Sequence, residues 1–402
     1  MKLCIWITKY FEQGGTKRVV TLLANELAKK HDVTLMVYDN RFKEDRDMYH
    51  LNEDVHIDFV DINDFVSHRR TPAWFYRGLI RRINRKTGRY NNAEHVDLLS
   101  EAIFPKAARE RFVEYFNAQG YDYIIATARL SLFLAMLAPD LKAKTIGWQH
   151  SCYANYVEGE WSLFWKQEAL LQHYIPKLDR YIVLTEYDVA EFKDKLGLEV
   201  YAIGNPKSFI CEQKSDLSAK QFFVATRLVP RKGLKYLVRA FAEFCKQDQE
   251  WTLLIAGDGP KRKDLIKSVW KAKLQERVHF TGATNQVQKY FQQSSVYLMT
   301  SQFEGWGLVV IEAFEAGLPV IAFDIPPMDL LITDMEDGIL VPHFNTSEYA
   351  RAMLLLAHDK ELRDSMGQKA IQKAKLYSIE EIAKIWDNMF LSLPDKKHEK
   401  ND

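Results

Sequence analysis

Short apolar runs alternate with amphipathic helical patterns along most of the chain. Runs that predict strands of a first half lie at 2–8, 32–38, 121–127, 143–149 and 180–185. Runs that predict strands of a second half lie at 221–227, 251–257, 278–282, 295–300 and 319–324, with helical patterns such as 234–246 between them. Strands that alternate with helices are typical of a parallel sheet covered on both faces. The pattern therefore predicts an α/β protein with two doubly wound domains.

The two halves meet in a segment where this pattern breaks. Gly204, Asn205 and Pro206 interrupt the chain there, and a polar stretch follows at 211–219. The length of 402 residues also favours two domains over a single core. We therefore place the boundary between residues 205 and 206.

Composition narrows the class of protein. Hydrophobic residues make up 47% of the chain, and 55 basic residues nearly balance 54 acidic ones, so no bulk attraction to nucleic acid is implied. The four cysteines lack the spacing of a metal site and suit reduced thiols in the cytosol. No apolar run approaches the roughly 18 residues of a spanning helix, and the apolar start is too short for a signal peptide. We therefore expect a cytoplasmic location.

Loops that leave a strand and enter a helix are the places to look for chemistry, because ligands of open α/β sheets bind beyond the carboxyl ends of the strands. The first such loop contains Gly14 and Gly15, before a helix expected from near Thr16. Paired glycines let a diphosphate approach backbone N–H groups at a helix N-terminus. A tight turn between strand and helix also needs glycine, so both interpretations stay open.

The second loop, at 225–233, carries Arg227, Arg231 and Lys232 between a strand and a helix. A guanidinium group suits a diphosphate through paired hydrogen bonds, and an ammonium group suits it as a point charge. Taken by itself, however, this loop fits a solvated surface loop better.

The third loop brings two carboxylates into one stretch. Glu304 follows the strand pattern at 295–300, and Glu312 lies eight residues on, in the next helix. Carboxylates placed in this way can accept hydrogen bonds from hydroxyls on different parts of an elongated ligand. A lone glutamate on a helix is more commonly solvated, but the apolar context of Glu312 makes an idle carboxylate costly. The N–H groups near the helix start, which suit phosphate, belong to Gly305, Trp306, Gly307 and Leu308.

Taken together, these motifs resemble those of family 4 glycosyltransferases of the GT-B fold, group 1 type. The resemblance is carried by Glu304 and Glu312 within 301–324, RLVPRKG, the AGDGP loop and the N-terminal GGTKRVV. It implies two Rossmann-like domains that face each other across a central cleft. Residues 1–205 would form the N-terminal, acceptor-binding domain, and residues 206–375 the C-terminal, nucleotide-sugar-binding domain. A helix at 376–395 would cross back to the N-terminal domain.

The resemblance also implies roles for single residues. Glu312 would accept hydrogen bonds from the ribose of the nucleotide, and Glu304 would contact hydroxyls of the transferred sugar. Arg227 and Lys232 would neutralise the diphosphate, on which charge builds as the glycosidic bond breaks. The donor-binding set implied in this way comprises Gly14, Gly15, Arg227, Lys232, Gly305, Trp306, Gly307, Leu308 and Glu312.

A fourth loop places His150 directly after the strand pattern at 143–149. In related enzymes a histidine at the end of a first-domain strand faces the donor sugar, and His150 matches that position. A histidine can hydrogen-bond a sugar hydroxyl or handle a proton near neutral pH. We therefore assign His150 and Glu304 as the catalytic residues, with a satisfied core histidine as the alternative for His150.

The resemblance implies a retaining reaction, and we expect it to need neither a metal nor another cofactor. Asp45-Arg46-Asp47 has the letters of an Asp-x-Asp metal motif, but it lies in a polar run with no strand before it, which favours a solvated loop. One segment, 325–341, departs from the family, which often carries a Gly-Pro-x-Glu-like sequence there. Asp329 is the residue that could stand in for the usual glutamate.

The segment 69–90 holds eight basic residues and no acidic one. On a helix, Phe75, Leu79 and Ile83 would share one face, and Arg77, Arg81 and Arg85 would lie nearly opposite. This arrangement fits a segment on an anionic membrane surface, which would make Arg77, Arg81, Arg82 and Arg85 the acceptor or membrane surface. A core helix with a solvated basic face fits equally well.

We therefore expect a glycosyltransferase that moves a hexose or N-acetylhexosamine from a nucleotide-diphosphate sugar to a saccharide or lipid-linked acceptor. UDP is the favoured carrier, with GDP next, and the pathway expected is surface polysaccharide or glycoconjugate biosynthesis. No nucleic-acid partner is expected, and a peripheral position on the inner face of the membrane is left open. The alternatives are a non-catalytic glycan-binding or partner-stabilising protein of the same fold, a nucleotide-sugar epimerase and a phosphorylase.

Overall fold

The computed structural model describes residues 1–12, 14–38, 44–60 and 71–394. Within these ranges the chain forms two compact units. Unit 1 comprises Met1–Asn205 together with the segment that begins at Ile379, and unit 2 comprises Pro206–Ser378. The chain passes from unit 1 to unit 2 between Asn205 and Pro206 and returns to unit 1 after Ser378.

Unit 1 is built on a parallel sheet in the order β3-β2-β1-β4-β5-β6-β7. Its strands are β1 (Lys2–Thr8), β2 (Asp32–Tyr38), β3 (Val55–Val60), β4 (Tyr123–Thr127), β5 (Lys144–Trp148), β6 (Arg180–Val183) and β7 (Tyr201–Ala202). The chain adds strands to one side of β1 and then, from β4 on, to the other side. The strand order therefore reverses between β1 and β4, which is where ligands of such sheets bind.

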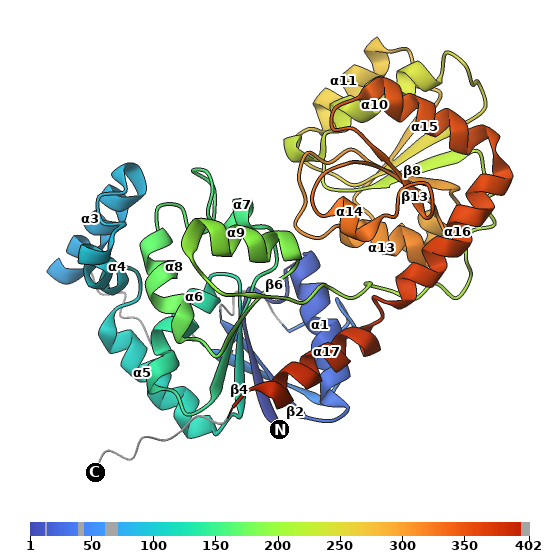
Figure 1. The fold of residues 1–402 in the computed structure, drawn as a ribbon. Coiled ribbons are helices and arrows are strands. Elements are labelled where there is room, and N and C mark those ends of the chain that lie inside the picture. The colour runs from blue at the N-terminus through green and yellow to red at the C-terminus, as the bar shows by residue number, and fades with distance from the viewer. Residues whose placement is uncertain (13, 39–43, 61–70, 395–402) are drawn as a thin grey trace. The chain divides into compact units, whose positions relative to one another are not determined.

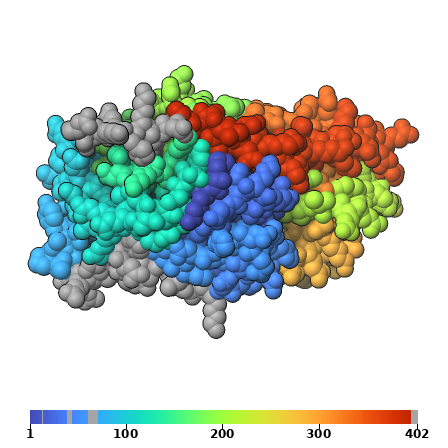
Figure 2. All heavy atoms as spheres, turned by 90° about the horizontal axis from the view of Figure 1, so that it is seen from below, coloured from blue at the N-terminus to red at the C-terminus, as the bar shows by residue number. Residues whose placement is uncertain are grey.

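Helices cover both faces of this sheet. They are α1 (Gly15–Ala28), α3 (Pro72–Thr87), α4 (Val96–Ile103), α5 (Lys106–Gln119), α6 (Leu130–Leu137), α7 (Tyr153–Tyr156), α8 (Glu168–Tyr174), α9 (Glu186–Leu196) and α17 (Ile379–Ser392). The last helix, α17, packs beside α1 although the two are far apart in sequence (Figure 1 and Figure 2). Its Trp386 is fully buried against Trp148, and Tyr123 donates a hydrogen bond to the carbonyl of Phe390. These contacts make α17 part of the core of unit 1.

Unit 2 repeats the same architecture on a second parallel sheet, in the order β10-β9-β8-β11-β12-β13. Its strands are β8 (Gln221–Ala225), β9 (Thr252–Ala256), β10 (Val278–Gly282), β11 (Val296–Met299), β12 (Val320–Phe323) and β13 (Gly338–Val341). Here the strand order reverses between β8 and β11.

The helices of unit 2 lie in two layers, one on each face of the sheet (Figure 1). One layer holds α10 (Leu234–Phe244), α11 (Arg262–Lys271) and α15 (Thr346–His358), and the other holds α13 (Leu308–Glu315), α14 (Met328–Leu331) and α16 (Lys360–Lys375). A short helix, α12 (Val287–Gln292), precedes β11. The inner strands β8, β11 and β12 are buried almost throughout, as expected for a parallel sheet covered on both faces, whereas the edge strand β10 is largely not.

Three strands were not predicted from the pattern of apolar runs: β3, β7 and β13. β3 lies at the edge of its sheet, and its side chains of His56 and Phe59 are exposed. β7 has two residues, and β13 has four at the other sheet's edge. β3 and β7 are partly exposed, so their sequences carry a weak apolar signal, whereas β13 is apolar and mostly buried but has only four residues.

Candidate functional site

The point of unit 2 at which the strand order reverses brings two charged loops together. The loop after β8 contains Lys232, in a short 3₁₀ helix (Pro230–Lys232), and the loop after β11 contains Glu304. The Nζ atom of Lys232 lies 2.5 Å from Oε1 of Glu304, and both side chains are largely buried. Two residues that are 72 positions apart in sequence thus form an ion pair at the carboxyl edge of the sheet.

Backbone contacts hold these two loops against each other. The side-chain amide of Gln302 donates to the carbonyl of Pro230, and its backbone N–H donates to the carbonyl of Arg231, each over 2.8 Å. Gly233 has φ +63°, and a Cβ atom there would lie 1.9 Å from the carbonyl oxygen of Thr300. Only glycine permits this approach, so Gly233 is required for the loops to meet.

The AGDGP loop after β9 joins the same assembly. The N–H of Leu228 donates to the carbonyl of Asp258 over 2.9 Å, and the N–H of Lys261 donates to the carbonyl of Leu228 over 2.9 Å. A Cβ atom on Gly257, where φ is +138°, would lie 1.8 Å from the carbonyl oxygen of Thr226. The loops of β8, β9 and β11 therefore form one hydrogen-bonded edge.

Arg227 lies in this edge and is exposed. Its guanidinium group makes no hydrogen bond or ion pair with a protein acceptor among the residues that the structure describes. Lys232 and Arg227 thus differ, because one cation is matched by a carboxylate and the other is open to an anion.

The start of α13 supplies backbone donors to the same edge. Gly305 and Trp306 precede Gly307, which caps the helix with φ +92°, and Leu308 is the first helical residue. A Cβ atom on Gly307 would lie 2.7 Å from Cε of Met328, so the side chain of Met328 packs directly against the backbone of this turn. The first N–H groups of a helix lack acceptors within the helix and favour an anion. The indole ring of Trp306 packs edge-on against Tyr377.

Glu312 and Glu315 lie one turn apart on α13, and both are buried. Glu312 accepts a hydrogen bond from the hydroxyl of Ser208. Glu315 is bound by Nζ of Lys207 at 2.6 Å, by Nζ of Lys214 at 2.5 Å and by the N–H of Cys211 at 2.9 Å. Burial opposes ionisation of Glu315, but these hydrogen bonds outweigh it and lower its pKa below the usual value. The carboxylate of Glu315 is therefore a structural anchor for the segment 207–214.

Tyr297, on β11, lies beneath the two glutamates that the sequence analysis singled out. Burial raises its pKa well above the ordinary value, and the charges of Glu312 and Glu304 add to that increase. Its hydroxyl donates to the carbonyl of Ala225 over 3.1 Å. Tyr297 thus lies in the same region of the sheet edge as Glu304, because the two side chains line one recess.

A small recess beneath the ion pair contains residues that sequence reasoning missed. Its lining includes Thr226, Thr300 and Ser301 besides Lys232 and Glu304. The hydroxyl of Thr226 is buried and makes no hydrogen bond within the described part of the chain. A hydroxyl at a strand end carries no distinctive sequence signal, so only its unpaired, buried state marks it as part of the site.

Unit 1 presents different chemistry beyond its strands. Gly14 and Gly15 stand exposed at the start of α1, where no side chain caps the helix. The N–H of Gly14 donates to the hydroxyl of Tyr49 over 2.8 Å. In the first turn of α1, Lys17 lies 4.0 Å from Glu12, and its pKa is lowered mainly by burial. This end of α1 is therefore positive and open at its N-terminus.

His150 follows β5 after the buried Gln149. Its ring packs on Trp148 with the ring centroids 4.2 Å apart. The backbone N–H of His150 donates a hydrogen bond to the hydroxyl of Tyr156 over 3.1 Å. Both ring nitrogens are buried, and neither makes a hydrogen bond with a described residue. Burial, with the charge of Lys17, lowers the pKa of His150 to about 3. The imidazole of His150 is thus buried without a hydrogen-bond partner among the described residues, which does not fit a satisfied core histidine.

Both halves of the chain match known families of glycosyltransferases. Residues 209–373 match the family described as Glycosyl transferases group 1, and residues 13–206 match the family described as Glycosyltransferase Family 4. The chain belongs to these group 1, family 4 glycosyltransferases. The resemblance inferred from the sequence motifs is thus confirmed.

Two relatives of this glycosyltransferase show how far the likeness extends. A Haemophilus influenzae protein described as an uncharacterized glycosyltransferase is 29% identical over 268 residues, 65% of this chain and 74% of that protein. An exopolysaccharide phosphotransferase of Streptomyces coelicolor is 28% identical over 410 residues, 99% of this chain. The alignment spans 41% of the Streptomyces protein, so this chain matches less than half of it.

Solved structures confirm the fold class. S. aureus TarM, in a mutant form in complex with fondaparinux, alpha-GlcNAc-glycerol and UDP, has a TM-score of 0.72 with this chain. The two are 19% identical, and the match covers 98% of this chain and 100% of that one. At this identity the likeness establishes the fold alone. The glycosyltransferase has the GT-B fold with its two Rossmann-like domains.

The arginines assigned to an acceptor or membrane surface lie on α3. Arg77 pairs with Glu101 over 3.6 Å, and Arg81 donates to the carbonyl of Ala102 over 2.7 Å, so both face α4. Phe75 and Leu79 are 58% and 53% exposed. Arg82 and Arg85 are exposed, as a solvated basic face would have them, but the face that carries Phe75 and Leu79 is exposed too, which a core helix would not have. Arg69 and Arg70, which began the basic segment, lie outside the described residues.

Other segments raised by the sequence lie as follows. Asp45 and Asp47 are exposed in a segment without helix or strand, as expected for a solvated loop. Asp329 is exposed in the first turn of α14. In the parts of the chain that the structure describes, no three His, Cys, Asp or Glu side chains are grouped to hold a metal ion. No described helix combines the length and apolar character needed to span a bilayer.

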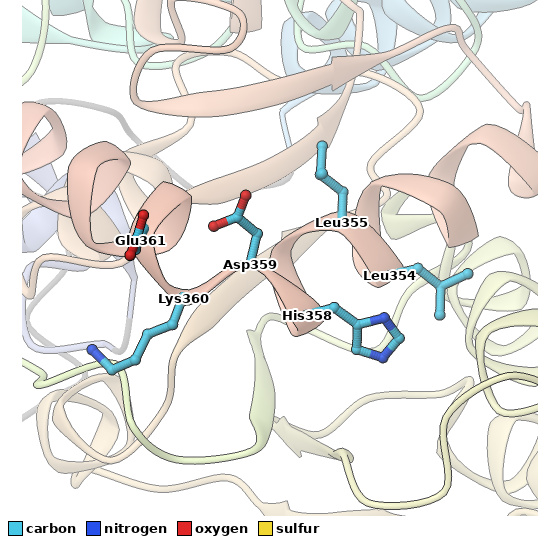
Figure 3. Close-up of a pocket in the computed structure, with 6 residues that line it drawn as sticks. All are labelled: Leu354, Leu355, His358, Asp359, Lys360 and Glu361. Atoms are coloured by element: carbon cyan, nitrogen blue, oxygen red, sulfur yellow. The ribbon is translucent and has the colours of Figure 1, made fainter.

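A second hollow of the glycosyltransferase lies elsewhere, where α15 ends and α16 begins (Figure 3). Its lining includes His358, Asp359 and Lys360, and His358 pairs with Asp248 over 3.2 Å. Asp248 lies in the loop that enters β9, so this hollow is at the amino edge of the sheet. The charged loops occupy the opposite, carboxyl edge, which is the edge that binds ligands in such folds.

Proposed function

We propose that the protein transfers a hexose or N-acetylhexosamine from a nucleotide-diphosphate sugar to a glycan acceptor, with retention of configuration. The observation that carries this proposal is the Lys232–Glu304 ion pair at the carboxyl edge of the sheet in unit 2, beside the open guanidinium of Arg227. A cation and a carboxylate in contact offer one group to phosphate and the other to sugar hydroxyls.

The diphosphate, the ribose and the sugar of the donor would each contact different residues of this edge. Arg227 and Lys232 would bind the diphosphate, together with N–H groups at the start of α13 around Gly307 and Leu308. Glu312 would exchange its contact with Ser208 for the ribose hydroxyls, and Glu304 would accept hydrogen bonds from the sugar. Burial supports these roles. Both carboxylates are largely shielded from water, and hydrogen bonds to hydroxyl groups are stronger where water is excluded.

Catalysis would rest on charge stabilisation. As the glycosidic bond breaks, negative charge grows on the diphosphate, and fixed cations stabilise that state more than the ground state. The leaving phosphate would help to remove the proton of the acceptor hydroxyl, and the sugar would react on one face. In unit 1, the imidazole of His150, which makes no hydrogen bond with the residues described, would offer a neutral hydrogen-bonding group for a sugar hydroxyl. The N–H groups at Gly14 and Gly15 offer a second anion-binding helix end.

UDP is the favoured carrier, because TarM, a structure with the same fold, was crystallised with UDP. The acceptor class proposed is a saccharide or a lipid-linked saccharide of surface polysaccharide or glycoconjugate biosynthesis. An exopolysaccharide phosphotransferase among the relatives supports the pathway. The reaction is proposed to need no metal ion, so chelation with EDTA should leave the rate unchanged.

One experiment tests the proposal and separates it from its rivals. Purified protein is incubated with UDP-sugars and candidate acceptors, and the nucleotide and sugar products are separated by chromatography. Glycosyl transfer releases UDP only when acceptor is present. An epimerase would convert the sugar without releasing nucleotide, and transfer of a sugar phosphate, suggested by the Streptomyces relative, would release UMP.

Binding without turnover would point to the non-catalytic alternative. Thermal unfolding with UDP, GDP, ADP and CMP identifies the carrier, because a ligand that binds only the folded state raises stability by RT ln(1 + [L]/Kd). A shift with UDP that Arg227→Ala abolishes would support the donor site. Full cellular function of folded Glu304→Ala and Glu312→Ala variants would overturn a catalytic role in favour of a scaffold.

A further inference from the structure

The outward face of α3 carries large apolar side chains and cations in one stripe. Phe75, Leu79, Arg82 and Lys86 follow each other at intervals of four, three and four residues, so they share one face of the helix. Ile80 and Asn84 are buried on the opposite face. Phe75 and Leu79 are more than half exposed, and Tyr76 beside them is 58% exposed.

Contacts on the buried side fix the orientation of this stripe. The side-chain amide of Asn84 donates to the carbonyl of Lys166 over 2.6 Å, and Arg81 donates to the carbonyl of Ala102. Thr71 caps the N-terminus of the helix, and Gly88 ends it with φ +75°. The helix is thus held at both ends and along one side, and its apolar residues cannot turn inward. Figure 1 shows α3 beside α4 at the periphery of unit 1.

Charge is distributed unevenly along the stripe. The apolar residues Phe75, Tyr76 and Leu79 occupy the first half of the helix, and the exposed cations Arg82, Arg85 and Lys86 occupy the second half. No acidic residue occurs from 71 to 93. The acidic side chain that pairs with α3, Glu101, is on the buried side with Arg77.

We propose that this face of α3 docks the protein on the surface of an anionic lipid bilayer. Phe75, Tyr76 and Leu79 would enter the boundary between headgroups and acyl chains, and Arg82, Arg85 and Lys86 would meet the lipid phosphates. A soluble polyanion would bind the cations but would not bury the exposed aromatic and aliphatic side chains. An anionic bilayer would bury the apolar half of the stripe and bind the cationic half. The contact is peripheral and does not depend on which donor or acceptor the enzyme uses.

A helix in unit 2 provides a matched comparison. α11 also carries three exposed lysines, Lys263, Lys267 and Lys271, and an exposed Trp270. It also carries Asp264, which pairs with Lys261, and it lacks a cluster of exposed apolar residues next to the cations. The proposal assigns membrane docking to α3 and not to α11.

The test measures binding of the full chain to vesicles of phosphatidylcholine and to vesicles of equal parts phosphatidylcholine and phosphatidylglycerol, by co-sedimentation at physiological ionic strength. Wild-type protein should bind the anionic vesicles only. Replacing Arg82, Arg85 and Lys86 by glutamine should lower the partition coefficient roughly a hundredfold, since each cation near the surface contributes about fivefold. Replacing Phe75 and Leu79 by serine should lower it roughly tenfold.

The control variant replaces Lys263, Lys267 and Lys271 by glutamine, which removes the same charge from α11. It should retain binding close to wild type, and thermal unfolding should confirm that all variants stay folded. Equal loss in the α11 variant would overturn the proposal, because general charge would then explain binding. Absence of wild-type binding would also overturn it. Binding that soluble polyphosphate abolishes and that ignores the Phe75/Leu79 change would assign the face to a polyanion instead.

Discussion

The two units share one architecture but differ in what stands at the carboxyl edges of their sheets. Unit 2 brings Lys232 and Glu304 into contact and keeps Glu312 buried nearby. Unit 1 instead presents the start of α1, which no side chain caps, and the buried imidazole of His150, which has a lowered pKa and no hydrogen-bond partner within the described ranges. The strands and covering helices therefore do not determine the chemistry, which depends on the loops they position.

The side chains proposed to bind ligand also differ between the units in whether they already have hydrogen-bond partners. In unit 2 the carboxylates and Lys232 already have partners, which a ligand must displace or share. In unit 1 the ring nitrogens of His150 are buried and make no hydrogen bond with any residue that the structure describes, so a ligand hydroxyl would satisfy groups that have lost their water. Substitutions should therefore act strongly on charge stabilisation in unit 2 and more mildly in unit 1.

The largest effect is expected at Lys232. Lys232→Ala should lower kcat/KM about 10²- to 10³-fold, because it removes a fixed cation and leaves Glu304 without its partner. UDP release in a steady-state assay measures this effect. Lys235→Ala, at an exposed position of the next helix, is the matched control and should remain near wild type. Similar activity in both variants would remove the ion pair from the mechanism.

Glu312 should control donor affinity more than turnover. Glu312→Ala should weaken UDP binding roughly 10- to 100-fold, since a hydrogen bond to a buried charged group contributes about 1.5–3 kcal/mol. Calorimetric titration with UDP gives the dissociation constant. The neighbouring Glu315→Gln should bind UDP as wild type does, because Glu315 is already bound to Lys207, Lys214 and Cys211. Equal losses would mean that α13 is merely disturbed.

His150 should show a smaller effect on rate and a distinct pH signature. His150→Gln should lower kcat roughly tenfold if the imidazole binds a sugar hydroxyl in the transition state. The folded-state pKa of about 3 lies below the unfolded value, so stability is fully present above about pH 6.5 and falls as the pH drops toward 3.

The variant lacks that dependence. Between about pH 6 and 4 the wild type should lose about 1.4 kcal/mol more stability per pH unit than His150→Gln. Urea unfolding at several pH values measures the difference. Parallel stability curves would show that His150 is protonated or paired in the folded protein.

The smallest effect is expected at Glu315, and on stability alone. Glu315→Gln should lower the free energy of unfolding by about 1–2 kcal/mol at pH 7, because the hydrogen bonds to a charged acceptor are weakened. The folded-state pKa of Glu315 is lowered, so the contribution is present above the unfolded value near 4.3 and disappears as the pH falls further. The difference between variant and wild type should shrink in acid. A constant difference would mean that the lost contact is not ionic.

Much of the architecture was predictable because it repeats a simple pattern. Apolar runs such as 221–227 and 251–257 became β8 and β9 within two residues at either end. The edge strand β3 escaped prediction because it is partly exposed and needs fewer apolar residues, and β13 escaped because its apolar run is only four residues long. The loops were located correctly for the same reason, since they follow the strands.

The helix α3 shows what the pattern of apolar and polar residues cannot predict, namely which face of a helix is buried. Its period separates Phe75 and Leu79 from Arg77 and Arg81, and the structure has that separation. Which face is covered depends on Glu101 and the Ala102 carbonyl of α4, about twenty residues away, and no periodicity encodes that choice. The exposed apolar stripe is therefore a finding of the structure.

The sequence by itself determined the two α/β domains, the family and the loops that carry charge, because strand and helix periods and local motifs are properties of neighbouring residues. Only the tertiary structure decided which charges meet. It paired Lys232 with Glu304 and Ser208 with Glu312, and it buried the ring of His150 without a hydrogen-bond partner in the described part of the chain. Such contacts depend on how strands distant in sequence are ordered in a sheet, and on the burial that removes water from each group.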